Sequence, residues 1–216
     1  MKKSVNSGSK EVSDNDEYHK YNKLILWITL FLLVLFEIYS VTTDSHYKWD
    51  FFFLVAMMVG VYVVKDKIKL HPFHFTLLGV FLILHNLGTF GTYRNFYYGL
   101  EFDFYVHTYF GFVSALMLYR TYNLIGPYRQ KWFMFIAIVA VVLGMSAFHE
   151  LFEYAGAMTV GEGEGVLFIG AGDIDEWDTQ KDMRNNLIGG ILALSFYFIY
   201  NKFPFNKKSQ QNLNNI

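Results

Sequence analysis

Cysteine is absent from this chain of 216 residues, proline occurs only three times, and charged residues make up only 17% of the sequence. The absence of cysteine excludes disulfide bonds, thiolate metal sites and cysteine nucleophiles. The formal net charge is −1, so neither sign of charge is in excess. Lysine and arginine fall in short separate segments rather than in one basic stripe, and nothing therefore indicates a nucleic-acid partner.

Apolar residues account for 53% of the chain and aromatic residues for 20%, which is typical of a membrane protein. Six apolar runs are long enough, or nearly so, to cross a hydrocarbon core of roughly 30 Å with about 20 residues each. We expect these runs near Leu24–Val41, Trp49–Val64, Phe73–Phe90, Phe102–Tyr119, Trp132–Tyr154 and Asn186–Phe203. The predicted fold is an all-α, polytopic membrane helix bundle with about six transmembrane helices.

The segments that flank these runs are polar and show almost no apolar periodicity. We expect residues 1–22 to form a disordered polar cytoplasmic tail, residues 23–204 a single six-helix transmembrane domain, and residues 205–216 a second polar cytoplasmic tail. The first run is interpreted as a retained span rather than a signal peptide, because its polar leader is long and no small-residue cleavage site follows it.

The orientation follows from the positive charges. With six spans both termini lie on one side, and fourteen of the eighteen lysines and arginines fall on that side. The opposite side keeps only Lys48, Arg94, Lys181 and Arg184. Because lysine and arginine are enriched in cytoplasmic loops, the sequence predicts that both termini are cytoplasmic.

Three of the predicted helices carry ionisable residues near their outer ends. The stretch "FHELFEYAG" closes the fifth run with His149, Glu150 and Glu153, and the first and last of these share one helical face. "EFDFYVH" opens the fourth run with Asp103 and His107, and "WDTQKDMRNN" leads into the sixth with Asp178 and Asp182. Residues at similar depth could form a surrounding polar layer: Glu37, His85, Asn86, Arg184 and Asn185.

Each pair alone has an ordinary structural explanation. A polar helix end can simply be solvated, and Asp103 or Asp178 can stabilise the first turn of its helix. A carboxylate within lipid, however, costs about 2.5–3.5 kcal/mol, and several on facing helices repel one another unless protons, arginines or a cation offset their charge. The combination therefore indicates a functional polar cluster at the outer leaflet.

Imidazoles and carboxylates together form a ligand set that suits Zn, Mn or Fe. The predicted metal ligands are His107, His149, Glu153 and Asp182. The candidates for a general base that acts on a metal-bound water are Glu150, Asp103 and Asp178. The order His-Glu-x-x-Glu is not the His-Glu-x-x-His motif of zinc proteases, so a protease is not indicated.

Nothing in the sequence indicates a nucleotide or haem cofactor. Gly161, Gly163 and Gly165 lack the strand and helix that surround a dinucleotide-binding fingerprint. We interpret the acidic segment 156–177 as a flexible outer loop, with a lid over the polar cluster as the alternative. The histidines outside the polar cluster are interpreted as surface residues: His19, His46, His71 and His74.

Four stretches carry a resemblance to a known family: "LHNLGTFGTY", "FDFYVHTYFGF", "HELFEYAG" and "WDTQKDM" followed by "NNLIGG". In combination, and from about Phe73 to the end of the sixth run, they resemble the YjdF-like family of bacterial inner-membrane proteins. The resemblance implies a multi-pass protein of the bacterial cytoplasmic (inner) membrane, but no reaction. It also implies a motif set of Asp103, His107, His149, Glu150, Glu153, Asp178 and Asp182.

Three functions remain open at this point. The first is a metal-dependent membrane enzyme that hydrolyses, or with a dinuclear iron site oxidises, a lipid or a small amphipathic ligand from the bilayer. The second is an ion- or proton-coupled transport or binding protein, which predicts polar residues along a path inward. Trp132–Met145 and Ile191–Tyr200 contain no ionisable residue, and this argues mildly against such a path. The third is a structural membrane protein with an acidic outer cap.

Overall fold

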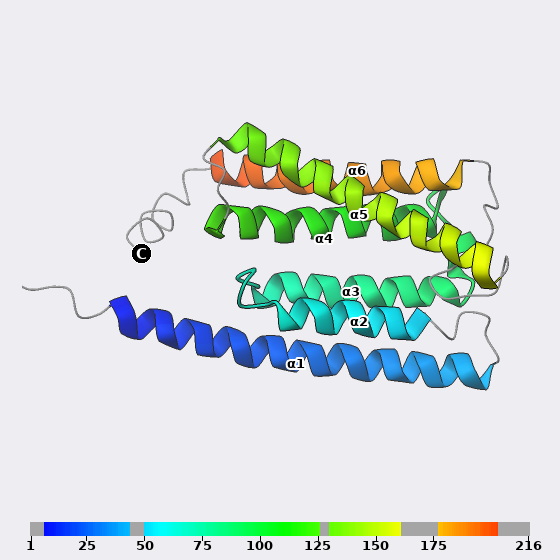
Figure 1. Ribbon diagram of the computed structural model, residues 1–216, viewed down its shortest axis with the longest axis horizontal. Coiled ribbons are helices and arrows are strands. Elements are labelled where there is room, and N and C mark those ends of the chain that lie inside the picture. Colours follow the sequence, from blue (N-terminus) through cyan, green and yellow to red (C-terminus); the bar gives the residue numbers. More distant parts are fainter. Residues whose placement is uncertain (1–6, 44–49, 126–129, 161–176, 203–216) are drawn as a thin grey trace, which may run out of the picture.

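The computed structural model describes the backbone of residues 7–43, 50–125, 130–160 and 177–202. Helices dominate this part of the chain, as the sequence predicts. The helices are α1 (Ser7–Thr42), α2 (Asp50–Val63), α3 (Pro72–Thr89), η1 (Thr92–Arg94), α4 (Phe102–Ile125), α5 (Lys131–Val160) and α6 (Asp178–Lys202). Each of the six long helices covers most or all of one predicted apolar run, and Figure 1 shows that successive helices run in alternating directions.

Several helices extend beyond their apolar runs. Helix α1 begins at Ser7, so residues 7–22, expected as part of a disordered tail, are helical. This segment contains no proline, and a helix that is already nucleated gains one hydrogen bond for each residue added. Helix α6 begins at Asp178 rather than near Asn186, which places the acidic residues before the sixth run on a regular helix. Residues 1–6 and 205–216 lie outside the described part of the chain.

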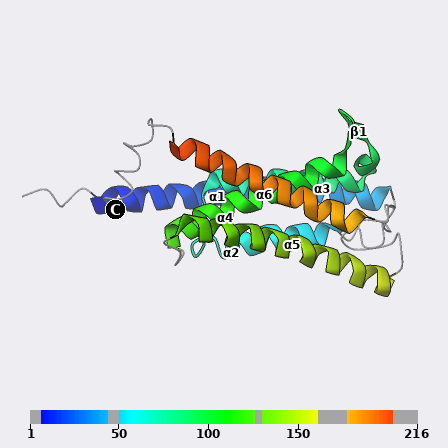
Figure 2. The same cartoon turned by 90° about the horizontal axis from the view of Figure 1, so that it is seen from above.

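A short hairpin, unforeseen from the apolar pattern, precedes α4. Strands β1 (Phe96–Tyr97) and β2 (Leu100–Glu101) pair antiparallel, with Phe96 opposite Glu101. The turn residues Tyr98 and Gly99 have φ values of 51° and 80°, and positive φ at both positions is what a two-residue hairpin turn of this hand requires. The hairpin projects away from the helices at the end where α4 begins (Figure 2).

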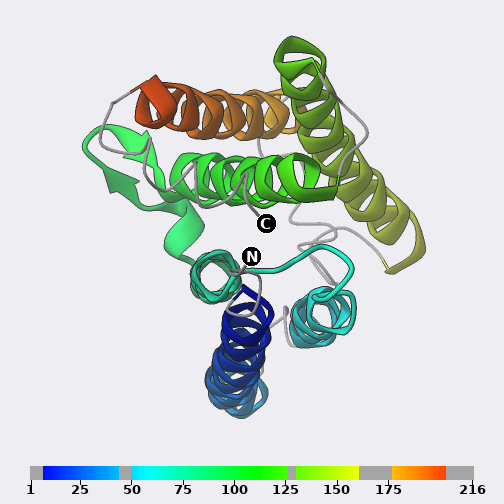
Figure 3. The same ribbon diagram turned by 90° about the vertical axis from the view of Figure 1, so that its left-hand side faces the viewer.

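The six helices form two groups that meet along α3 and α4. One group comprises α1, α2 and α3, and the other comprises α4, α5 and α6 (Figure 3). Leu33, Leu54 and Phe75 are fully buried in the first group, together with residues of α4. Ile138 and Val142 of α5 are buried against α4 and α6 in the second. The contact between α4 and α6 is the most extensive of any helix pair.

Large apolar side chains are also exposed along the outer faces of the helices. Trp27 and Phe31 on α1, Trp132 and Phe148 on α5, and Phe196 on α6 are examples. Within the described residues, Glu17–Thr42 and Lys131–Phe152 are long and apolar enough to cross a membrane, and Phe51–Val63 and Pro72–Gly88 are shorter apolar helices. An exposed apolar surface of this extent suits contact with lipid rather than with water.

Candidate functional site

Two glycines allow α4 and α6 to approach with their backbones in contact. A Cβ atom at Gly111 of α4 would collide with the main chain of Asn186, and one at Gly189 of α6 would collide with the main chain of Thr108. Small residues at such positions are what permit close helix packing in membrane proteins. The close approach holds the first turns of α4 and α6 side by side, and these turns carry the predicted acidic residues.

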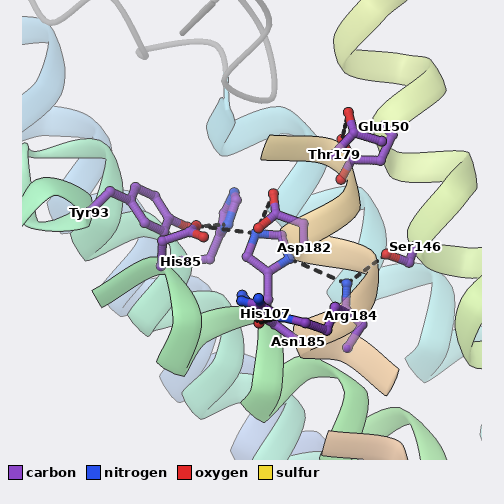
Figure 4. A network of polar contacts seen from close by, with 11 residues as sticks. His85, Tyr93, His107, Ser146, Glu150, Thr179, Asp182, Arg184 and Asn185 are labelled. Carbon is purple, nitrogen blue, oxygen red and sulfur yellow. Dashed lines mark hydrogen bonds and ion pairs between the residues drawn. The ribbon is translucent and has the colours of Figure 1, made fainter. Parts of the chain in front are cut away.

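The centre of the site is the group formed by Asp103, His107 and Asp182. His107 Nε2 lies 3.3 Å from Asp103 Oδ1 on its own helix and 3.4 Å from Asp182 Oδ2 on α6. One potential ligand atom from each residue lies within 4.8 Å of the other two. Figure 4 shows the imidazole next to the Asp182 carboxylate. We call these three residues the Asp–His–Asp group.

Asn186 connects this group to α5. Its Nδ2 donates a hydrogen bond to Ser146 Oγ at 2.7 Å and lies 3.3 Å from His107 Nδ1. Asn186 is one helical turn after Asp182, so both face α4. The imidazole of His107 is thus held through both of its ring nitrogens, which fixes the orientation of the ring.

Two further histidines lie next to the group. The ring centroid of His149 is 6.3 Å from that of His107 and also 6.3 Å from that of His85. His85 Nδ1 in turn lies 2.8 Å from the hydroxyl of Tyr93, which comes from η1 (Figure 4). Three imidazoles from α3, α4 and α5 therefore gather in one region.

A second polar contact joins α5 to α6. Thr179 Oγ1 donates a hydrogen bond to Glu150 Oε2 at 2.9 Å (Figure 4). Arg184, by contrast, donates through Nε and Nη2 to Asn185 Oδ1, at 3.2 and 3.0 Å. The guanidinium of Arg184 therefore pairs with its neighbour in sequence, and within the described part of the chain it forms no ion pair with the Asp–His–Asp group.

The histidines border a cavity of about 150 Å³ between the two helix groups. Its polar lining comes from His85, His107, Ser146, His149 and Asn186. Its apolar lining comes from α2, α3, α4 and α5: Phe53, Leu54, Met57, Phe81, Val106, Phe110, Met145, Phe148 and Phe152. The cavity is thus lined mainly by apolar side chains, with a few polar side chains from α3, α4, α5 and α6 among them.

Asp182 Oδ1 and Asn186 Oδ1 are buried oxygen atoms of this region with no hydrogen-bond partner among the described residues, and the two residues are only 6% and 1% exposed. A buried oxygen without a partner is costly, and such atoms in folded proteins usually bind water or an ion. The donor set of two carboxylates and one imidazole suits a divalent cation such as Zn or Mn, so these residues fit a metal ion.

The structure brings together most, but not all, of the predicted site residues. Asp103, His107 and Asp182 form one group, His149 and His85 lie beside it, and Asp178 and Glu150 lie close enough to Asp182 to act on it electrostatically. Asn86 and Asn185 are buried. Glu37 is on α1, which packs mainly against α2 and α3. The side chain of Glu153 and the loop residues 161–176 lie outside the described part of the structure.

Some residues of the site were missed in the sequence. Ser146, Tyr93 and Thr179 each make a polar contact within it, although none carries a charge at neutral pH. A signal for Ser146 existed, because it lies three residues before His149 and so on the same helical face. The interpretation of His74 as a surface residue is wrong: it is buried, with Nε2 3.4 Å from the hydroxyl of Tyr197. The position of His74 near the start of a helix in the sequence does not reveal that α6 covers its side chain.

Comparisons with known proteins agree with this architecture. The family model described as "Predicted membrane protein (DUF2238)" matches residues 23–203. The chain is 28% identical over 189 residues to the inner membrane protein YjdF of Escherichia coli (strain K12), an alignment that covers 80% of this chain and 88% of that protein. No solved structure matches the chain. The predicted resemblance is confirmed, as is the location in the bacterial cytoplasmic membrane. The chain belongs to the family of predicted membrane proteins DUF2238.

Proposed function

We propose that this protein crosses the membrane six times, with both termini in the cytoplasm, and that it is a metal-dependent hydrolase of a lipid or other amphipathic substrate. The Asp–His–Asp group binds the metal ion at the outer leaflet. The observation that carries the proposal is that His107 belongs both to this group and to the lining of the adjacent cavity. A metal ion at His107 therefore lies next to a space that can hold a substrate.

The alternating direction of the helices supports the topology (Figure 1). Asp103 and Asp182 are in the first two turns of α4 and α6, whereas Lys65, Lys67 and Arg120 are at the opposite ends of the helices. The acidic end of the bundle is thus separated from the basic end by the length of the helices. Enrichment of positive charge on the cytoplasmic side assigns the acidic end to the outer leaflet.

The number and type of side chains in the Asp–His–Asp group support a bound metal ion. Three protein ligands with one position left for water or substrate are the arrangement of catalytic zinc sites. Asp103 lies within the Asp–His–Asp group, so the geometry favours it as a ligand rather than as the general base. His149 borders the cavity beside His107, with the two ring centroids 6.3 Å apart, and is the better candidate for the base. Divalent metal ions supply a Lewis acid and an activated water in such sites.

The described interior argues for an enzyme rather than for a transport path. Inward from Ser146 and Asn186, the space between α4, α5 and α6 is filled by apolar side chains. They include Ala115, Leu116, Ile138, Val142, Ala193 and Leu194. A proton or ion path needs polar side chains or water along its length. The polar cluster therefore has the character of a site that is closed on its inner side.

Metal analysis tests this proposal. Protein purified in mild detergent and incubated with Zn, Mn or Fe should retain about one equivalent of one of these ions, because one Asp–His–Asp group is present among the described residues. His107→Ala and Asp182→Asn should each reduce the bound metal to background. Mass spectrometry of the metal content checks this.

A matched control exists in the exposed pair His19 and Asp66, whose Nδ1 and Oδ1 atoms are 4.0 Å apart. His19→Ala and Asp66→Asn should leave the metal content unchanged. Equal metal in all five proteins, or no metal in the wild type with any of the three ions, would overturn the metal site.

A further inference from the structure

The cavity beside the Asp–His–Asp group has an incomplete protein wall on one side. Met145, Phe148 and Phe152 of α5 line the cavity, yet all three are also exposed on the surface of the molecule. A side chain that borders an internal space and the exterior at once marks the edge of an opening. This edge runs along the outer half of α5.

Helix α2 lines the cavity from another side, with Phe53, Leu54 and Met57. Among the described helices, α2 packs closely against α1 and α3, and α5 packs closely against α4 and α6, but α2 and α5 do not pack closely against each other. Figure 3 shows both helices on the same side of the bundle. The cavity therefore lies behind two helices that face each other without a helix interface between them.

The surroundings of this opening are apolar. The three lining side chains that are exposed at the surface there, Met145, Phe148 and Phe152, are all apolar. In a membrane protein, surfaces of this kind contact the hydrocarbon chains of the lipid. A molecule that enters between α2 and α5 therefore comes from the bilayer and not from the aqueous phase.

We infer that the substrate of this site is a membrane lipid, one of whose hydrocarbon chains enters the cavity sideways between α2 and α5. Hydrolysis of the lipid rests on the proposed function, whereas entry of the lipid into the cavity does not require the metal ion. The histidines of the lining, His85, His107 and His149, then receive the headgroup end. The apolar side chains, which make up most of the lining, contact the hydrocarbon chain.

The volume limits how much of the lipid enters. A dry cavity of about 150 Å³ holds an apolar group roughly the size of benzene. Only the segment of one chain next to the headgroup fits, and the remainder stays in the bilayer. The lipid therefore reaches the histidines without leaving the membrane, which avoids the cost of exposing its whole chain to water.

Photochemical labelling tests this entry route. The full chain is reconstituted into vesicles of phosphatidylethanolamine and phosphatidylglycerol that contain a phospholipid with a diazirine near the carboxyl end of one acyl chain. After irradiation, mass spectrometry locates the adducts. Val106 and Phe81 line the cavity and are only 2% and 7% exposed, so lipid around the protein does not reach them. Adducts on these two residues are the expected result.

A pair of tryptophan variants on α2 provides the control. Met57→Trp fills the cavity and should reduce adducts on Val106 and Phe81 at least fivefold, whereas Val59→Trp, on the exposed face of α2, should not. Met145→Phe is a smaller filling substitution from the α5 side, for use if Met57→Trp does not fold as judged by size-exclusion chromatography. Adducts confined to exposed residues, or an unchanged yield in every filling variant that folds, would overturn the inference.

The same samples separate this inference from the metal site. Met57→Trp should lose the buried adducts and keep its metal, and His107→Ala should lose its metal and keep the adduct on Val106. A wild-type protein with buried adducts and no metal would contradict the proposed function alone. A wild-type protein with metal and no buried adducts would contradict lipid entry alone.

Discussion

Gly111 of α4 lies directly against the main chain of Asn186 of α6, with no room for a methyl group between them. One turn further along α6, Gly189 makes the equivalent contact with Thr108. These contacts set the distance between the two helices. The 3.4 Å contact between His107 and Asp182 depends on that distance, because each residue is one turn from the glycine contact on its own helix.

Gly111→Ala should therefore force α4 and α6 apart. We expect the free energy of unfolding to fall by about 1–3 kcal/mol, the usual range for overpacking, and the bound metal to decrease. Gly144→Ala on α5 is the matched control, since nothing lies within 4 Å of its Cβ position. It should be neutral or stabilising by up to about 1 kcal/mol, the difference in helix propensity. Thermal unfolding in detergent, followed by circular dichroism, measures both; equal effects would contradict the packing argument.

The absence of cysteine makes the topology directly testable with single-cysteine variants. Asn95 precedes the hairpin and Asp66 lies between α2 and α3, and both side chains are exposed. In intact cells, Asn95→Cys should react with a membrane-impermeant maleimide. Asp66→Cys should react only after the membrane is permeabilised. The opposite pattern would place the Asp–His–Asp group on the cytoplasmic side.

Tyr93→Phe removes the hydroxyl that lies 2.8 Å from His85 Nδ1. The ring remains packed against Gly88, so only the hydrogen bond is lost. The expected decrease in the free energy of unfolding is about 0.5–1.5 kcal/mol. Tyr105→Phe, whose hydroxyl donates to Tyr97 O in an exposed position, should cost less, because water replaces an exposed hydrogen bond. A larger loss for Tyr105→Phe in the same unfolding assay would contradict this assignment.

Binding of the metal ion should stabilise the folded protein in a concentration-dependent way. At an ion concentration of 100 times Kd, the free energy of unfolding should rise by about 2.7 kcal/mol, because the ion binds the native state and not the unfolded chain. A chelator should reverse the effect. Asp182→Asn should show no stabilisation by the ion, whereas Asp66→Asn should respond like the wild type. A rise in stability that is equal in both variants would place the ion elsewhere.

The helical architecture was predictable because the thickness of the hydrocarbon core sets the length of the apolar run in a membrane helix. The Asp103, His107 and Asp182 group was also predictable, since a spacing of four residues fixes a helical face and the alternating topology brings the ends of α4 and α6 to one level. Run length does not reveal where a polar segment continues a helix, and so the extension of α1 to Ser7 was not foreseen.

The cavity could not be predicted in the same way. Phe53 and Met57 line it, while Leu33 and Phe75 fill the core of the first helix group, and nothing in residue type separates the two pairs. The difference arises from how α2 and α5 sit in space, which depends on all six helices at once. Ser146 was missed for a related reason, because a single hydroxyl in an apolar run becomes informative only when its partner Asn186 is known.

Helix α2 has only 14 residues and so extends about 21 Å at 1.5 Å per residue. A bilayer accommodates so short an apolar helix by thinning locally, at a cost of a fraction of a kcal/mol per Å of mismatch. In the six-span topology that we propose, such thinning would lie next to α2, which supplies Phe53 and Met57 to the cavity lining. Headgroups next to α2 would then lie deeper than in the surrounding membrane, and a lipid would travel a shorter vertical distance to reach the histidines.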